Sequence, residues 1–186
     1  MWDYNKFILY PVNITKPNLD FAKILVTAIG GYSGELAAAM RYLNQRDTMP
    51  TAEGKALLTD IGTEELAHVE ILSVMLKQLT KGVSLDEIKK SKFLGSYIEH
   101  KKSYFPTNVD GNPYTVDYYA STGDYIADLY EDLAAEMKAK AVYESLMDVT
   151  DDPEILGPLS FLRQREIIHF NRFKDLLNKY ESGNLK

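Results

Sequence analysis

Two segments of the chain each place a glutamate and a histidine three residues apart on what is otherwise the apolar face of a helix. The segment TEELAHVE contains Glu65 and His68, and the segment REIIHF contains Glu166 and His169. In both segments the neighbours at helical spacing are apolar. An ionised carboxylate taken out of water costs several kcal/mol, so these residues indicate that a compensating charge lies in the core.

The pattern extends to two further glutamates. Glu35 precedes Glu65 by 30 residues, and Glu136 precedes Glu166 by 30 residues. Both Glu35 and Glu136 also lie on the apolar stripe of their own segment. Each half of the chain therefore reads Glu followed by Glu-x-x-His, and we interpret this as an internal two-fold pseudo-repeat of function.

These residue types at this spacing predict a dinuclear metal site. Side chains three residues apart on a helix project to the same side. A Glu from each of two helices, with Glu-x-x-His from each of two others, is the ligand set of dinuclear carboxylate sites in four-helix bundles. Divalent cations would offset the carboxylate charges, and each histidine would offer a neutral nitrogen. Oxygen-rich ligation with two imidazoles and no sulfur favours manganese or iron over structural zinc.

The other acidic residues near these motifs are interpreted as solvated. Glu64 and Glu70 flank the first motif but lie off the apolar stripe, with a supporting role beside the metal site as the alternative. The same surface interpretation applies to Glu131, Glu144, Glu154 and His100.

Four long helices are expected to position the site. The first segment, residues 1–17, has two prolines and is predicted to be an extended lead-in. Residues 81–122 are rich in Gly, Pro, Asn and Asp and predict a long crossover, with a short helical piece at 86–90. The predicted helices span 18–46, 51–80, 123–148 and 152–181. Short turns join the first pair and the second pair, so the expected fold is all-α: a ferritin-like four-helix bundle with one long crossover between helices 2 and 3, forming a single domain over 1–186.

Three glycines interrupt the first of these helical patterns. Gly30, Gly31 and Gly34 each cost a helix up to about 1 kcal/mol relative to alanine. Close packing between helices would explain them, and so would room for a small substrate beside the metal site. The sequence alone leaves both explanations open.

Composition excludes several classes of protein. The chain has 186 residues, 45% of them apolar, and a net charge of −6 without a basic block, which argues against nucleic-acid binding. It has no cysteine, so it cannot form disulfides, iron–sulfur ligation or a thiolate nucleophile. Its most apolar run, FAKILVTAIGGYSGELAAAM, carries Lys23 and Glu35, which a membrane span of that length would not. No secretory signal is evident, and we expect a cytoplasmic protein.

The motifs resemble those of the dimanganese catalases. The resemblance is carried by WDYNKFILYPVNI, GGYSGELAAAMRYLNQR, DIGTEELAHVEIL and REIIHF, and it runs from about Trp2 to Tyr180. The chain length resembles that of the short spore-coat members of this family, the CotJC type. The resemblance implies a non-haem enzyme that converts two molecules of hydrogen peroxide to oxygen and two of water, with a manganese pair that cycles between the Mn(II)/Mn(II) and Mn(III)/Mn(III) states.

The resemblance also implies a role for each residue. Glu35 and His68 would bind one manganese, and Glu136 and His169 the other. Glu65 would bridge both ions. Glu166 would ligate neither ion but would handle protons beside the solvent bridge, and Tyr42 would hydrogen-bond near the cluster.

Assembly and location follow from the same resemblance as expectations. It implies a homo-oligomer, expected to be a hexamer with helix 1 and the lead-in at the contacts, and it raises a spore-coat location with other coat proteins as partners. The chain ends at Lys186, without the C-terminal extension of longer members, so control of access to the site is expected to differ. Two alternatives remain: a ferritin-like di-iron oxidase or storage protein, and a structural coat protein with a metal-stabilised core.

Overall fold

Most of the regular elements in the described part of the chain are helices. The computed structural model describes residues 7–91, 98–99, 103–104 and 107–183. Five longer helices make up the bundle: α1 (Leu19–Gly30), α2 (Glu35–Gln45), α3 (Ala52–Leu79), α5 (Tyr125–Met147) and α6 (Pro153–Glu181). The 3-10 helix η1 (Arg46–Thr48) forms part of the short turn between α2 and α3.

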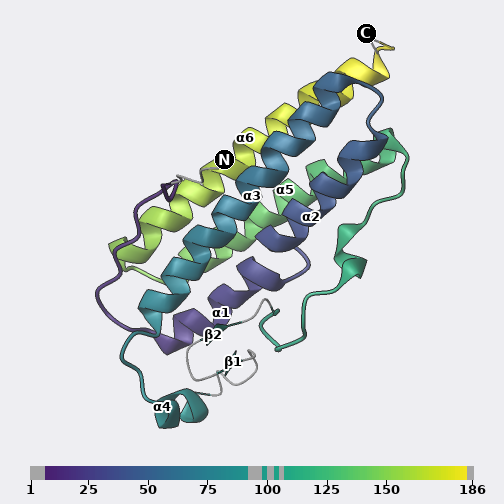
Figure 1. The fold of residues 1–186 in the computed structure, drawn as a ribbon. Helices are drawn as coiled ribbons and strands as arrows, with labels where there is room; N and C mark the ends of the chain where they lie inside the picture. The colour runs from purple at the N-terminus through teal and green to yellow at the C-terminus, as the bar shows by residue number, and fades with distance from the viewer. Residues whose placement is uncertain (1–6, 92–97, 100–102, 105–106, 184–186) are drawn as a thin grey trace, which may run out of the picture.

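The predicted all-α fold is confirmed, and the helices are arranged as expected for a bundle with one long crossover. The helix α2 packs along α3, and α5 packs along α6. Figure 1 shows α1 and α2 following one another along one side of the bundle, and residues 107–124 running along the outside to the start of α5. This connection lets α3 and α5 run in the same direction, as in ferritin-like bundles.

The elements in the described part of the crossover are short. It begins after α3 with α4 (Leu85–Lys90), where the sequence predicted a helical piece, and the 3-10 helix η3 (Val116–Tyr119) lies near its end. Within the described residues the strands are two antiparallel pieces of two residues each, β1 (Ile98–Glu99) and β2 (Ser103–Tyr104). The fully buried Arg41 of α2 fastens the crossover to the bundle, because its guanidinium donates to the carbonyl oxygens of Tyr118 and Tyr119.

The predicted helix starts agree closely with those observed. Thr51 caps α3 by accepting from the backbone N–H of Gly54, and Asp124 caps α5. Asp152 caps α6 and is followed by Pro153 at the first helical position, where a missing N–H costs nothing.

The prediction of one unbroken helix over residues 18–46 is wrong. The helix ends at Gly30 and restarts at Glu35, with a turn between them. Three glycines within five residues weaken the helix at this point. The backbone of Gly34 then lies against the end of α1: a Cβ at this position would be 2.9 Å from the carbonyl oxygens of Thr27 and Ile29. Close packing therefore explains Gly34, and its consequence is that Glu35 becomes the first residue of a new helix.

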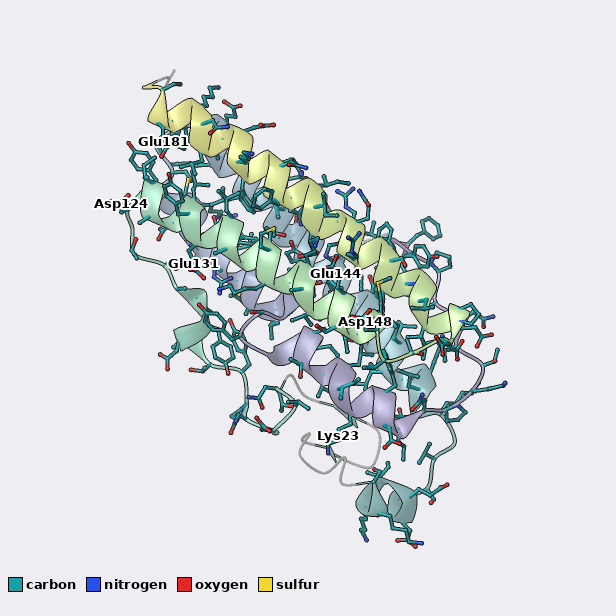
Figure 2. The ribbon with its side chains drawn as sticks, turned by 180° about the vertical axis from the view of Figure 1, so that it is seen from behind. Lys23, Asp124, Glu131, Glu144, Asp148 and Glu181 are labelled. Carbon is teal, nitrogen blue, oxygen red and sulfur yellow. The ribbon has the colours of Figure 1, made fainter. Side chains whose placement is uncertain are left out.

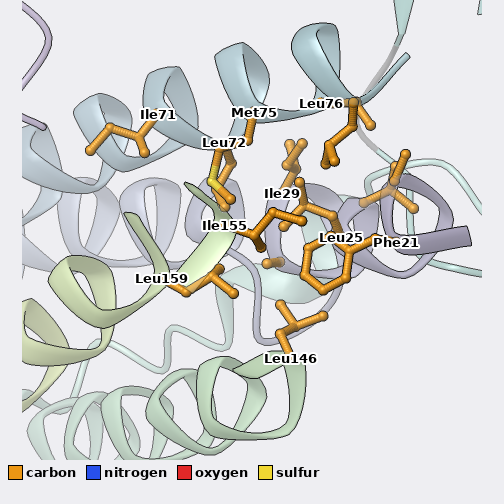
Figure 3. Packing of buried hydrophobic residues seen from close by; sticks show 14 of the residues in the cluster. Phe21, Leu25, Ile29, Ile71, Leu72, Met75, Leu76, Leu146, Ile155 and Leu159 are labelled. Atoms are coloured by element: carbon orange, nitrogen blue, oxygen red, sulfur yellow. The ribbon is translucent and has the colours of Figure 1, made fainter. Parts of the chain in front are cut away.

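Two apolar clusters fill the bundle on either side of its middle. One joins α1 to the later turns of α3 and the early turns of α6, and it includes Leu25, Leu72 and Leu159 (Figure 3). The other joins α2 to the early turns of α3 and the late turns of α6, and it includes Leu58 and Phe173. Polar side chains that lie between these clusters are cut off from water along the bundle axis.

The described part of the lead-in, residues 7–17, lies on the outside of the bundle. Ile14 is buried, and its backbone N–H donates to Gln78 of α3 over 2.6 Å. Thr15 donates to Glu154 on α6 over 2.7 Å.

Glu131 and Glu144 lie on the outer surface of α5 (Figure 2), where Glu144 pairs with Lys140 and Arg163. Their predicted surface positions are confirmed.

A single methyl group at residue 34 is expected to disturb the fold. Gly34→Ala places a Cβ against three carbonyl oxygens of α1, so we expect the free energy of unfolding of the metal-free protein to fall by about 1–3 kcal/mol. Chemical denaturation measures this. Ser33→Ala in the same turn is the control, expected to change stability by less than about 0.5 kcal/mol. Equal stability of the two variants would contradict the packing explanation.

Candidate metal centre

The six predicted side chains meet in the middle of the bundle. Glu35 comes from α2, Glu65 and His68 from α3, Glu136 from α5, and Glu166 and His169 from α6; each is at most 2% exposed. Two groups of four possible ligands form, each with ligand atoms within 4.8 Å of one another. The first group consists of Glu35, Glu65, His68 and Glu166, and the second of Glu65, Glu136, Glu166 and His169.

Glu65 lies between the two halves. One of its carboxylate oxygens is 2.7 Å from Nδ1 of His68, and the other is 2.8 Å from Nδ1 of His169. Glu166 lies further out, with its nearest oxygen 3.8 Å from Nδ1 of His68. The two imidazole rings are stacked, with centroids 5.7 Å apart. The Nδ1 atoms therefore face the centre of the cluster.

The donor atoms fit a metal pair. Both oxygens of Glu65, one oxygen each of Glu35, Glu136 and Glu166, and all four imidazole nitrogens are buried without a hydrogen bond within the described part of the chain. Buried polar atoms are normally satisfied. So many unsatisfied oxygen and nitrogen donors facing one volume is the arrangement that divalent cations complete, and oxygens with imidazoles are ligands that manganese accepts.

The pKa values show how strongly the protein alone resists ionising this cluster. Burial, and then the charge of Glu65, raise the pKa of Glu35 from its ordinary 4.5 to about 8. Burial, with the charges of Glu35 and Glu65, raises the pKa of Glu166 well above its usual range. Burial also raises the pKa of Glu136. Without metal, the protein therefore makes ionisation of each of these three carboxyl groups less favourable than it is in water.

For the two histidines, the surroundings favour the charged form of the side chain. Burial lowers the pKa of His169, but the charge of Glu65 outweighs it and the pKa rises to about 11. Burial likewise lowers the pKa of His68, and the charges of Glu65 and Glu35 raise it well above its ordinary value. The metal-free cluster thus balances imidazolium rings against carboxylates, and metal ions must displace these protons to bind.

Two buried tyrosines support the carboxylates, one in each half. The hydroxyl of Tyr42 donates to Glu136 over 2.5 Å, which agrees with the predicted position of Tyr42 beside the cluster. The hydroxyl of Tyr143 donates to Glu35. Tyr143 was not among the site residues predicted from the sequence, although each tyrosine lies seven residues after the first glutamate of its own half. That repeated spacing was the signal that could have identified it.

The interpretation of Glu64 as a solvated residue is wrong. Its side chain is 17% exposed, and its oxygens lie 3.5 Å from Nε2 of His68 and 3.2 Å from Nε2 of His169. Arg165 contacts the same carboxylate through two nitrogens. Glu70 is exposed, as predicted, and His100 lies outside the described residues.

The fold and these six side chains define a class of protein: the ferritin-like bundles that hold a dinuclear carboxylate site. Within that class, the manganese containing catalase family matches residues 1–184. The chain belongs to this family, which has a dimanganese centre, and it is a non-haem manganese catalase.

Individual relatives agree. The chain is 47% identical to protein CotJC of Bacillus subtilis over 175 residues, which cover 94% of this chain and 92% of the relative. It is 36% identical to a probable manganese catalase of Clostridium acetobutylicum, with 92% and 76% covered. KatB, a manganese catalase from Anabaena, superposes with a TM-score of 0.87 at 31% identity, covering 100% of this chain and 83% of KatB. No helix in the described part of the chain is long and apolar enough to cross a membrane.

Metal uptake is expected to release protons. At pH 7 the raised pKa values of Glu35, His68 and His169 leave all three groups protonated in the metal-free protein. Loading manganese into a chelated sample in weakly buffered solution should therefore release about three protons per chain. A pH-stat measures the release, with protein already loaded as the blank. Release of less than one proton would contradict this charge balance.

Tyr143 is expected to matter as much as Tyr42. Tyr143→Phe removes the hydroxyl that orients Glu35, so manganese affinity should fall about 10-fold, as we expect for Tyr42→Phe at Glu136. Competition with a chelator measures both. Tyr180→Phe is the control, because that hydroxyl contacts Thr51 at the end of the bundle. If Tyr143→Phe retains manganese as well as Tyr180→Phe does, Tyr143 has no role in holding the site.

Proposed function

We propose that Glu35 and His68 bind one manganese ion, that Glu136 and His169 bind the other, and that Glu65 bridges the two. The observation that carries this assignment is the position of Glu65. Its two oxygens approach the Nδ1 atoms of the two histidines almost equally, at 2.7 and 2.8 Å. Atoms bound to one ion at about 2.1 Å each lie about 3 Å apart, so these separations suit ligands that share an ion.

The reaction converts two molecules of hydrogen peroxide to oxygen and two of water. When bound, the manganese pair supplies two electrons to one peroxide and recovers them from the next. The protein contributes the buried volume between the two apolar clusters, the ligands that neutralise the ions, and a group that holds protons.

Glu166 is our candidate for that group. Peroxide loses two protons when it is oxidised to oxygen, and two protons are needed when it is reduced to water. Glu166 is buried beside the cluster, one of its oxygens makes no hydrogen bond within the described residues, and it lies further from the His68 ring than Glu65 does. A carboxyl group in this position can accept a proton in one half-reaction and return it in the other.

The alternative role for Glu166 is that of a second bridging ligand, equivalent to Glu65. Glu166, like Glu65, belongs to both groups of four possible ligands. A second bridging carboxylate is what a di-iron oxidase or storage protein would need. Metal content by mass spectrometry, on protein expressed with manganese and iron both supplied, tests the choice of metal directly. Two manganese ions per chain support our assignment, and iron in their place would contradict it.

The variant Glu166→Gln separates the two roles of this residue. It keeps the size of the side chain and removes the base. We expect it to retain both manganese ions and to lose at least about 100-fold in oxygen evolution. Glu144→Gln, on the outer face of α5, is the control and should retain full activity. Loss of a metal ion would make Glu166 a ligand, whereas full activity with both ions would exclude the proton-handling role.

We also propose that the chain assembles as a homo-hexamer through the lead-in and the α1–α2 face. Oligomeric assembly is typical of this family. Phe7 and Leu9 of the lead-in are 83% and 46% exposed, and Tyr32, between α1 and α2, is 42% exposed. Large apolar side chains that are exposed on a surface favour a protein interface there. A place in the spore coat is proposed only on the likeness to CotJC, and the cytoplasm is the alternative.

Light scattering tests the assembly. The wild-type chain is expected to have the mass of six chains at micromolar concentration. Phe7→Ser with Leu9→Ser should shift it toward smaller species. Val116→Ser is the matched control, since Val116 is 68% exposed but lies on the crossover. A monomeric wild-type protein would rule the hexamer out, and an unchanged mass in the double variant would exclude the lead-in as its interface.

A further inference from the structure

One carboxylate serves both histidines. Glu64 lies on α3 one turn before His68, and its two oxygens divide between the rings: Oε1 is 3.5 Å from Nε2 of His68, and Oε2 is 3.2 Å from Nε2 of His169. These are the nitrogens that face away from the cluster. Arg165 contacts the same carboxylate, so Glu64 is held between a guanidinium and the two imidazole rings.

Arg165 fixes the orientation of that carboxylate. Its guanidinium Nε is 2.5 Å from Oε1 of Glu64, and its Nη2 is 3.1 Å from Oε2. Two parallel contacts from a planar fork hold the plane of a carboxylate, which a single contact cannot do. Glu64 and Arg165 also line an open cleft of about 760 Å³, together with Thr63, Ala67 and Phe161. The ion pair thus lies between that cleft and the two imidazole rings.

The pseudo-repeat explains why a single carboxylate has this task. Glu64 and Arg165 are 101 residues apart, and the same offset relates Glu65 to Glu166 and His68 to His169. Glu64 and Arg165 are therefore equivalent positions, each one turn before the histidine of its half. Where strict symmetry would give each histidine its own carboxylate, this chain supplies one carboxylate and one guanidinium.

We propose that Glu64, locked by Arg165, is the positioning residue for both metal-binding histidines. It keeps a proton on each Nε2, so that each Nδ1 presents its lone pair to the cluster. Losing Glu64 therefore weakens both metal positions together. This inference rests on the proposed metal site, and the experiment begins with wild-type protein that binds two manganese ions.

The competing explanation is an ordinary ion pair that joins α3 to α6. The same two helices carry such a pair elsewhere: Arg172 contacts Asp60 over 2.7 Å, with side chains that are 35% and 64% exposed. No contact of this second pair involves a histidine among the described residues. Arg172→Ala is therefore the matched control for helix pairing without an effect on the rings.

The first comparison sets Glu64→Ala against Arg172→Ala. We measure manganese content, manganese affinity by chelator competition, and thermal stability of the metal-free protein. Glu64→Ala should lose about 10- to 100-fold in affinity at both metal positions, and Arg172→Ala should retain wild-type affinity. Wild-type affinity in Glu64→Ala, or a loss confined to one position, would overturn the proposal. A wild-type protein without manganese would instead remove the proposed function itself.

Two further variants keep the proposal testable if Glu64→Ala folds poorly. Glu64→Gln has one acceptor oxygen for two N–H donors, so one metal position should weaken much more than the other. The exchange Glu64→Arg with Arg165→Glu returns a carboxylate to the equivalent position on α6. It should restore manganese binding to at least half of the wild-type content, while either single charge reversal should abolish it. An exchange variant as empty as the single reversals, or Glu64→Gln with two unaltered positions, would contradict the proposal.

Discussion

The cost of burying four carboxyl groups and two imidazoles in one apolar core governs this structure. The two apolar clusters lie on either side of these six side chains along the bundle axis and exclude water from them. The six side chains are each at most 2% exposed, so water cannot stabilise their charges. Protonation of carboxyl groups and histidines, with the hydroxyl groups of Tyr42 and Tyr143, offsets part of this cost. A pair of divalent cations offsets more of it, and the ligand geometry is arranged for such a pair.

The two halves of the site have the same types of side chain but place them differently. Each half has a glutamate, a Glu-x-x-His pair and a tyrosine seven residues after the first glutamate, and Tyr42 and Tyr143 each donate to a carboxylate of the other half. The symmetry fails at Glu65 and Glu166, because only Glu65 lies within 3 Å of both Nδ1 atoms. The proposed roles use this difference, with Glu65 as the bridge and Glu166 as the group that exchanges a proton.

Sequence patterns predicted the bundle and its six central side chains because periodicity reports the inward face of each helix. A charged residue on that face is visible within a single helix. Glu64 was misjudged for the same reason: it lies off the stripe of α3, and its contacts with His169 and Arg165 come from a separate helix, α6. The break at residues 31–34 was missed because the apolar spacing continues through it. The three glycines weaken the helix there, and the close approach of Gly34 to the carbonyl groups of α1 is a contact that spacing does not report.

The break places Glu35 at the first position of α2, where the positive end of the helix dipole favours a carboxylate. This stabilisation is smaller than the free-energy cost of ionising Glu35 in the core. A helix N-terminus stabilises a negative charge by about 0.3–1 kcal/mol, and by about 2 in favourable buried positions. A pKa of about 8 in place of 4.5 corresponds to roughly 5 kcal/mol against ionisation of Glu35. The local backbone thus offsets less than half of the cost, and the hydroxyl of Tyr143 is already engaged with this carboxylate. The remaining charge must come from the bound ions, which is why the fold brings both histidine-bearing helices to the same point as Glu35.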